Sequence, residues 1–77
     1  MVGGFDAVEY TELKSSNVFA VAYDPLTRRM ELVMKGGTYR YYQVPLEVYL
    51  GLLIAPSAGK YVNERIAHVY AYRQGAG

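Results

Sequence analysis

The chain has no cysteine and only one histidine among its 77 residues. Without thiols it can form neither a disulfide nor a thiolate zinc centre, and a single imidazole argues against a structural metal. The absence of cysteine also suits a cytoplasmic location. A chain this short is near the lower limit at which one apolar core supports a fold, so we expect self-association to add stability.

The sequence also lacks long apolar runs and a strong excess of charge. No stretch is long enough to span a bilayer, and no charged segment followed by a short apolar core marks a signal peptide. The net charge is +1 at pH 7, which argues against extensive binding to a nucleic-acid duplex. The charge is uneven, with a net −3 over residues 1–24 and a net +4 over residues 25–77. This balance favours a small anionic ligand or a short contact with RNA.

Tryptophan is absent, but the chain contains nine tyrosines. Tyrosine combines a flat apolar ring with a hydroxyl that needs a partner. It therefore suits a core, an interface or the surface beneath a stacked nucleobase.

The stretch from Met30 to Pro45 is the centre of the predicted fold. Gly36-Gly37 can supply the positive φ angles of a tight turn, so we expect a hairpin there with Lys35 opposite Thr38. Side chains alternate between the faces of a strand, which defines two sets. The predicted core face carries Met30, Leu32, Met34, Tyr39 and Tyr41. The wetter face carries Glu31, Val33, Lys35, Thr38, Arg40 and Tyr42.

The remaining elements follow from local patterns. An apolar, β-branched run predicts a strand over residues 18–23, and residues 10–14 could add an edge strand. Pro45 and Ser57 mark the starts of two helices, over residues 46–55 and 57–66. Alternation over residues 68–72 predicts a closing strand. We therefore expect an α+β domain over residues 13–73, in which an antiparallel meander of three to four strands packs on two short helices. Residues 1–12 form an extension, either an edge strand or disordered, and residues 74–77 a disordered tail.

The first helix is apolar on almost every side. One stripe is expected to cover the sheet and consists of Leu46, Tyr49, Leu50 and Leu53. A second stripe faces a different direction and consists of Val48, Leu52 and Ala55. Because so short a chain has little left to cover the second stripe, we expect it to form the interface of a homo-oligomer.

The order and spacing of several short motifs resemble the KTSC domain over residues 13–73. The motifs are Ser15-Ser16-Asn17, Ala22-Tyr23-Asp24, Met30-x-Leu32-x-Met34-Lys35-x-Gly37, Tyr39-x-Tyr41, Val44-Pro45, Tyr49, Ala55-x-Ser57-x-Gly59-Lys60-Tyr61-x-Asn63 and the run 66–70. That family takes its name from a C-terminal appendage of some lysyl-tRNA synthetases. The resemblance implies an α+β module suspected of binding RNA. This chain departs from the pattern in its additional N-terminal residues and in Met34, which stands where a large aromatic residue is expected.

Three groups of residues are candidates for ligand contact. The first group is the run Tyr39-Arg40-Tyr41-Tyr42. In it, Arg40 and Tyr42 point away from the predicted core, whereas Tyr39 and Tyr41 are expected beneath the helix. The second is the start of the second helix, where free N–H groups and a lysine suit an anion: Ser57, Gly59, Lys60 and Asn63. An ordinary helix cap explains the same serine equally well. The third group is Arg28-Arg29 with Arg73, for which a solvated rim is the simpler interpretation. His68 is interpreted as structural or exposed.

No pattern indicates catalysis or a cofactor, so we do not expect an enzyme. The sequence favours a non-catalytic module that binds RNA or a small phosphate-containing nucleotide, which the subunits of a homo-oligomer could share. The alternative is a protein-interaction or assembly module that acts through its apolar helix. Neither function involves a membrane.

Overall fold

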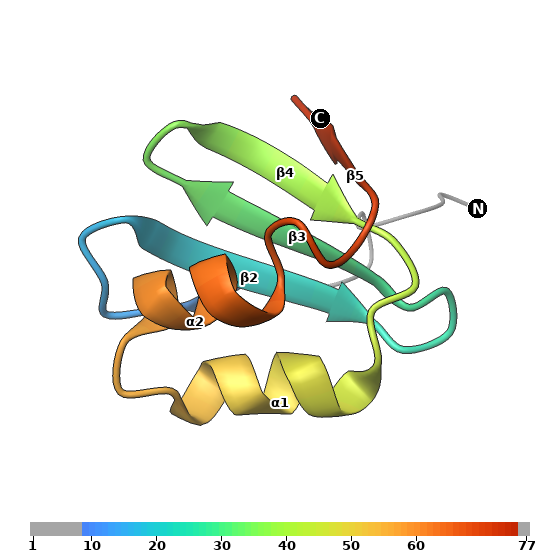
Figure 1. Cartoon of the computed structure of the whole chain (residues 1–77), viewed down its shortest axis with the longest axis horizontal. Coiled ribbons are helices and arrows are strands. Elements are labelled where there is room, and N and C mark those ends of the chain that lie inside the picture. The colour runs from blue at the N-terminus through green and yellow to red at the C-terminus, as the bar shows by residue number, and fades with distance from the viewer. Residues whose placement is uncertain (1–8, 76–77) are drawn as a thin grey trace.

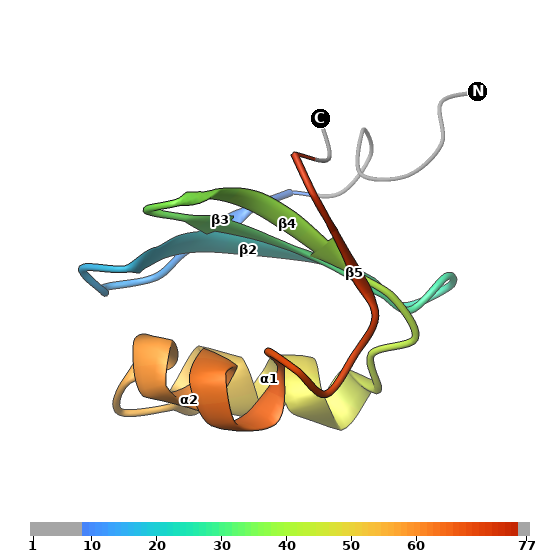
Figure 2. The same ribbon diagram turned by 45° about the horizontal axis from the view of Figure 1, so that its top comes forward.

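The computed structural model describes residues 9–75, in which a twisted antiparallel sheet carries two helices on one face (Figures 1 and 2). The strands are β1 (Thr11–Glu12), β2 (Val18–Asp24), β3 (Arg29–Met34), β4 (Gly37–Tyr41) and β5 (Tyr72–Gln74). The helices are α1 (Leu46–Ile54) and α2 (Ala58–Arg65). The strands lie in the sheet in chain order. The predicted α+β meander is confirmed, with five strands instead of three to four.

The β3–β4 hairpin differs from the prediction in its turn. The turn is Lys35-Gly36, and Gly37, with φ of 136°, is already the first residue of β4. Leu32 therefore pairs with Tyr39, whereas the predicted register, with Lys35 opposite Thr38, would pair it with Tyr41. Because side chains alternate with a period of two, a two-residue shift of partner leaves the side chains within both strands on their predicted faces, whereas Lys35 lies in the turn. The core-face assignment is correct although the register was wrong.

The core lies between the sheet and the helices. Its fully buried side chains come from β2, β3, the segment before α1, both helices and the residue after α2: Val18, Val21, Met30, Leu32, Val44, Leu52, Val62 and Ile66. Tyr23 anchors α1 to the sheet, because its hydroxyl donates to the Val44 carbonyl at 2.6 Å and its ring stacks on Tyr49 with centroids 4.8 Å apart.

Helix α1 is rotated relative to the predicted stripes. Leu52 is 1% exposed within the protomer, and Val48 packs against the core, so neither forms a free interface. The reason is that α2 covers this side: the Tyr61 hydroxyl donates to the Val48 carbonyl at 2.9 Å and lies so close to Gly51 that a Cβ would not fit there. Ala55, the last predicted interface residue, is half-buried just after the helix.

The apolar side chains that α1 exposes are spaced four residues apart. Leu46 and Leu50 are each 48% exposed and Ile54 is 84% exposed, in a single row along the helix. The prediction had assigned two of these residues to the sheet-covering stripe.

Both ends of the described chain add strands to the sheet. The predicted edge strand within residues 10–14 is present as β1, which pairs with β2. The closing strand begins at Tyr72 instead of spanning residues 68–72. Gln74 pairs with Tyr39 in this strand, so the prediction of a disordered tail was wrong for residue 74. The predictions for residues 1–8 and 76–77 lie outside the described residues. No helix within residues 9–75 is long and apolar enough to cross a bilayer.

Candidate ligand-binding cleft

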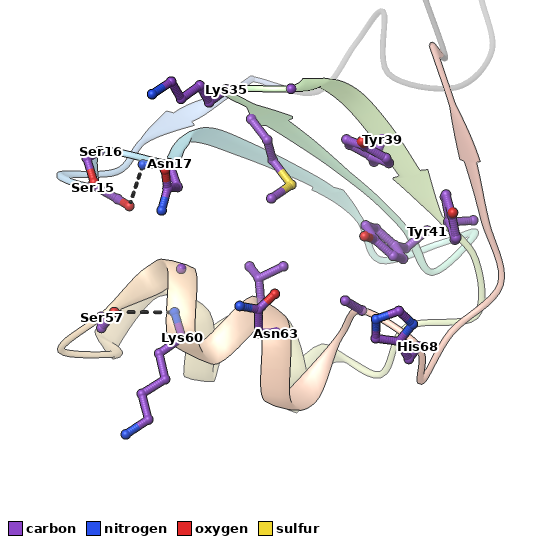
Figure 3. Close-up of a pocket in the computed structure, with 16 residues that line it drawn as sticks. Ser15, Ser16, Asn17, Lys35, Tyr39, Tyr41, Ser57, Lys60, Asn63 and His68 are labelled. Carbon is purple, nitrogen blue, oxygen red and sulfur yellow. Dashed lines mark hydrogen bonds between the residues drawn. The ribbon is translucent and has the colours of Figure 1, made fainter.

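An open cleft of about 650 Å³ lies between the sheet and α2. Its walls come from the loop before β2, the β3–β4 hairpin with β4, and α2 with the turn that follows it (Figure 3). Tyrosines and a histidine line one end, and serine, asparagine and lysine side chains line the other. The cleft therefore has an aromatic end and a polar end.

Three tyrosines of β4 and β5 form the aromatic end. The ring centroid of Tyr72 lies 5.7 Å from that of Tyr39 and 5.5 Å from that of Tyr41. Tyr41 is 4% exposed and Tyr72 is 55% exposed, so Tyr72 and half-buried Tyr39 offer the accessible ring surface. Burial raises the pKa of Tyr41, and the neighbouring Tyr39 and Tyr72 raise it by a smaller amount. The Tyr41 hydroxyl therefore stays protonated and uncharged at neutral pH.

The polar end forms where three segments meet. The Ser15 hydroxyl oxygen accepts the backbone N–H groups of Asn17 and Val18, both at 3.2 Å, and thereby shapes the loop before β2. The Asn17 carbonyl accepts the backbone N–H of Lys35 at 2.9 Å, which ties this loop to the hairpin.

Helix α2 closes the polar end from the other side. The Ser57 hydroxyl oxygen accepts the Lys60 N–H at 3.3 Å, so Ser57 is an N-cap as well as a lining residue. Gly59 packs on the Asn17 side chain, whose amide nitrogen would lie 3.7 Å from a Cβ at that position. Both serines retain a hydroxyl hydrogen that a ligand could accept.

The cleft lining carries positive charge without compensating carboxylates. Exposed Lys35 lies on the sheet side and exposed Lys60 on the helix side, from which the Lys60 side chain extends away from the sheet (Figure 3). Within residues 9–75, no aspartate or glutamate is among the lining residues. Asn63 lies between the two ends and offers both a donor and an acceptor. These features suit a ligand with an anionic group at one end and a flat apolar group at the other.

The structure places the three predicted groups of ligand-contact residues in different surroundings. Ser57, Gly59, Lys60 and Asn63 line the cleft, whereas Arg40, Tyr42 and Arg73 do not. Arg40 projects from the opposite face of the sheet and forms an ion pair with Glu31 at 3.2 Å. Arg40 thus points away from the core, as predicted, and its contact with a ligand stays a prediction outside this cleft.

The partner of Arg40 on the outer face of the sheet is a buried carboxylate. Glu31 was predicted on the wetter face, yet it is 3% exposed and accepts hydrogen bonds from Tyr10 and Arg40. A buried carboxylate requires such partners. Arg73, the cross-strand neighbour of Arg40 in β5, is exposed.

Sequence reasoning missed most of the aromatic end. Strand alternation placed Tyr39 and Tyr41 on the helix-facing side correctly, but it could not show that α2 leaves this part of the face open. The sequence predicted His68 and Tyr72 within one strand, but His68 lies in the turn after α2 and Tyr72 begins β5. The motif Ser15-Ser16-Asn17 was a usable signal, since two of its members shape the polar end. Among residues 9–75, no three or more metal-ligating side chains cluster together.

Residues 14–70 match the family profile of the KTSC domain. The chain belongs to the KTSC domain family. The crystal structure of a KTSC domain protein from Yersinia pestis superposes with a TM-score of 0.85 at 28% sequence identity, covering 88% of this chain and 97% of that one. The family predicted from the motifs is thus confirmed.

Relatives of this KTSC chain include small proteins and part of a larger enzyme. A protein of Tsukamurella paurometabola is 46% identical over 52 residues, which is 66% of this chain and 78% of the relative. An uncharacterized protein of Stutzerimonas stutzeri is 40% identical over 68% of this chain and 75% of its own length. A lysine–tRNA ligase of Nostoc is 35% identical over 90% of this chain, which corresponds to 13% of the ligase.

Proposed function

We propose that this KTSC domain is a non-catalytic module that binds one phosphate-bearing nucleotide unit in the cleft. The unit is either a free nucleotide or an exposed nucleotide of single-stranded RNA, because both present the same base, sugar and phosphate. The observation that carries the proposal is the pairing, in one cleft, of accessible tyrosine rings with two lysines, with no carboxylate among the described residues that line it.

The cleft has suitable dimensions and chemistry for such a ligand. Its volume of about 650 Å³ falls within the range of roughly 300–1,000 Å³ typical of small-molecule sites. Stacking of one base on an aromatic ring contributes about 1–3 kcal/mol. Lys35 and Lys60 supply the charge for a phosphate at the polar end, and the net charge of +1 favours a short ligand over an extended strand.

The lysine–tRNA ligase relative supports RNA as one source of the nucleotide, since the shared segment is part of a protein that acts on tRNA. The two sources predict different length dependence. A free nucleotide predicts equal affinities for a mononucleotide and a single-stranded octamer. An RNA site predicts that the octamer binds at least tenfold more tightly.

The cleft also lacks an arrangement for nucleophilic catalysis. Ser15 and Ser57 lie at the polar end, and His68 lies at the aromatic end (Figure 3). A catalytic serine needs its base within hydrogen-bond reach. We therefore propose that the cleft binds its ligand without turnover.

The decisive experiment measures binding of the four nucleoside 5′-monophosphates and of fluorescent single-stranded RNA octamers. The double variant Lys35→Ala/Lys60→Ala is expected to bind at least tenfold more weakly, and the salt dependence of binding should fall because two cations are removed. Lys14→Ala is the matched control, since Lys14 is exposed and does not line the cleft. A parent protein that binds none of these probes, or a double variant that binds as the parent does, contradicts the proposal.

A second candidate function is assembly through α1. It rests on the exposed apolar row of Leu46, Leu50 and Ile54, and a row of this kind often marks an interaction surface. In sedimentation velocity, Ile54→Glu should convert an oligomeric parent to a monomer. Leu26→Glu is the control, because Leu26 is 93% exposed but lies in the β2–β3 turn. A parent that sediments as an 8.6 kDa monomer removes this candidate.

A further inference from the structure

The turn after α2 places His68 in the left-handed region, with φ of 67°. A residue in this conformation just beyond a helix is usually glycine, because a Cβ is disfavoured there. Within residues 9–75, three non-glycine residues have positive φ: Arg28, Gln43 and His68. Of these, His68 alone lines the cleft.

Backbone hydrogen bonds close this turn. The N–H groups of Val69 and Tyr70 both donate to the Ile66 carbonyl, at 3.1 and 3.3 Å, and the N–H of Ala67 donates to the Val62 carbonyl at 2.7 Å. These bonds would remain with glycine at position 68, which would also tolerate the positive φ. The fold thus has no need of an imidazole here, and the side chain is exposed.

The imidazole lies on the helix side of the aromatic end, and the labelled tyrosines of β4 lie on the sheet side (Figure 3). Tyr72 presents its exposed ring to the same end. Imidazole is a planar aromatic ring, and histidine is among the side chains that stack on unpaired nucleobases. A flat group that entered this end would therefore meet aromatic rings on two sides.

We propose that His68 is a specificity-determining residue that forms the second wall of a base-binding slot, opposite Tyr39 and Tyr72. This inference rests on the proposed nucleotide-binding function and adds which end of the cleft receives the base and which residue encloses it. The base lies between the imidazole and the tyrosines, and the phosphate lies at the lysine end.

The test compares His68→Gly and His68→Asn with the parent, using the nucleoside 5′-monophosphates, the corresponding nucleosides and inorganic phosphate as probes. Both variants suit a positive φ, so their melting temperatures should equal or exceed that of the parent. Their affinities for nucleotide and nucleoside should fall at least fivefold, and the affinity for inorganic phosphate should not change. Gln43→Gly relieves the same kind of backbone conformation away from the cleft, and it should leave nucleotide affinity unchanged.

The outcomes separate this inference from the proposed function. If the parent binds nucleotides and His68→Gly binds them equally well, the slot is wrong and the proposed function stands. If His68→Asn retains the affinity that His68→Gly loses, a polar contact replaces stacking and the slot is again wrong. A lower melting temperature of His68→Gly would show that the side chain serves the fold. A parent that binds no probe overturns both proposals.

Discussion

The two faces of the sheet carry similar side chains but place them in different electrostatic surroundings. On the outer face, the guanidinium of Arg40 pairs with Glu31, a carboxylate that is 3% exposed. On the side of the helices, Lys35 of the hairpin turn and Lys60 of α2 border a cleft whose lining, within residues 9–75, contains no carboxylate. A cation beside tyrosine is therefore not sufficient to mark a binding surface. The position of the nearest acid decides whether its charge is available to a ligand.

The largest expected effect concerns stability and the outer face. Arg40→Ala should lower the free energy of unfolding by about 3 kcal/mol, because it leaves the Glu31 carboxylate buried without its charged partner. Arg73→Ala, at the exposed neighbouring position in β5, should change it by less than about 0.5 kcal/mol. Urea denaturation measures both values. Equal stabilities of the two variants would show that the ion pair does not stabilise the fold.

The next effect concerns binding and the inner face. Tyr72→Ala should weaken nucleotide binding by about 2 kcal/mol, roughly thirtyfold, since an accessible stacking surface is lost. Tyr42→Ala provides the matched tyrosine outside the cleft lining and should leave affinity unchanged. Isothermal titration calorimetry distinguishes the two variants. A Tyr42 variant that binds more weakly than the Tyr72 variant would reverse the assignment of the faces.

The smallest effect is a pH dependence at the base of the aromatic end. Burial raises the pKa of Tyr41 above its ordinary value of 10.0, so the folded state holds this proton more tightly than the unfolded state does. The stability that results is fully present below pH 10 and is lost as the pH rises through the folded pKa. Burial raises the pKa of Tyr23 as well, which contributes with the same sign.

Thermal melts between pH 8 and pH 12 test this dependence. Tyr41→Phe should show a shallower decline above pH 10 than the parent, because the buried ionisable hydroxyl is gone. The decline that Tyr23 causes remains in the variant and serves as an internal reference. Identical profiles would show that Tyr41 ionises as easily in the folded as in the unfolded chain.

Local patterns predicted the strands, the helices and the faces of the hairpin. Met30 and Leu32 are buried as expected, because alternation depends only on the period of a strand. The turn was misplaced because two adjacent glycines allow two registers that give the same faces. Position in the sequence alone does not distinguish between them.

The remaining errors come from contacts between distant residues. The rotation of α1 depends on the stack of Tyr49 on Tyr23 and on the approach of Tyr61 to Gly51, neither of which a helical stripe reveals. The burial of Glu31 depends on Tyr10, twenty-one positions away in the chain. Half of the site was predicted because a helix start is a local signal, whereas the aromatic end is assembled by the whole fold.

The approach of Tyr61 to Gly51 also concerns the helix that forms one wall of the cleft. Tyr61 belongs to the helix that carries Lys60 and Asn63, and its hydroxyl is held against α1 by the Val48 carbonyl. A Cβ at position 51 would collide with that hydroxyl, so the Tyr61 side chain would have to shift. A single methyl group placed between the two helices, outside the lining of the cleft, would thus disturb the contact that holds α2, one wall of the cleft, against α1.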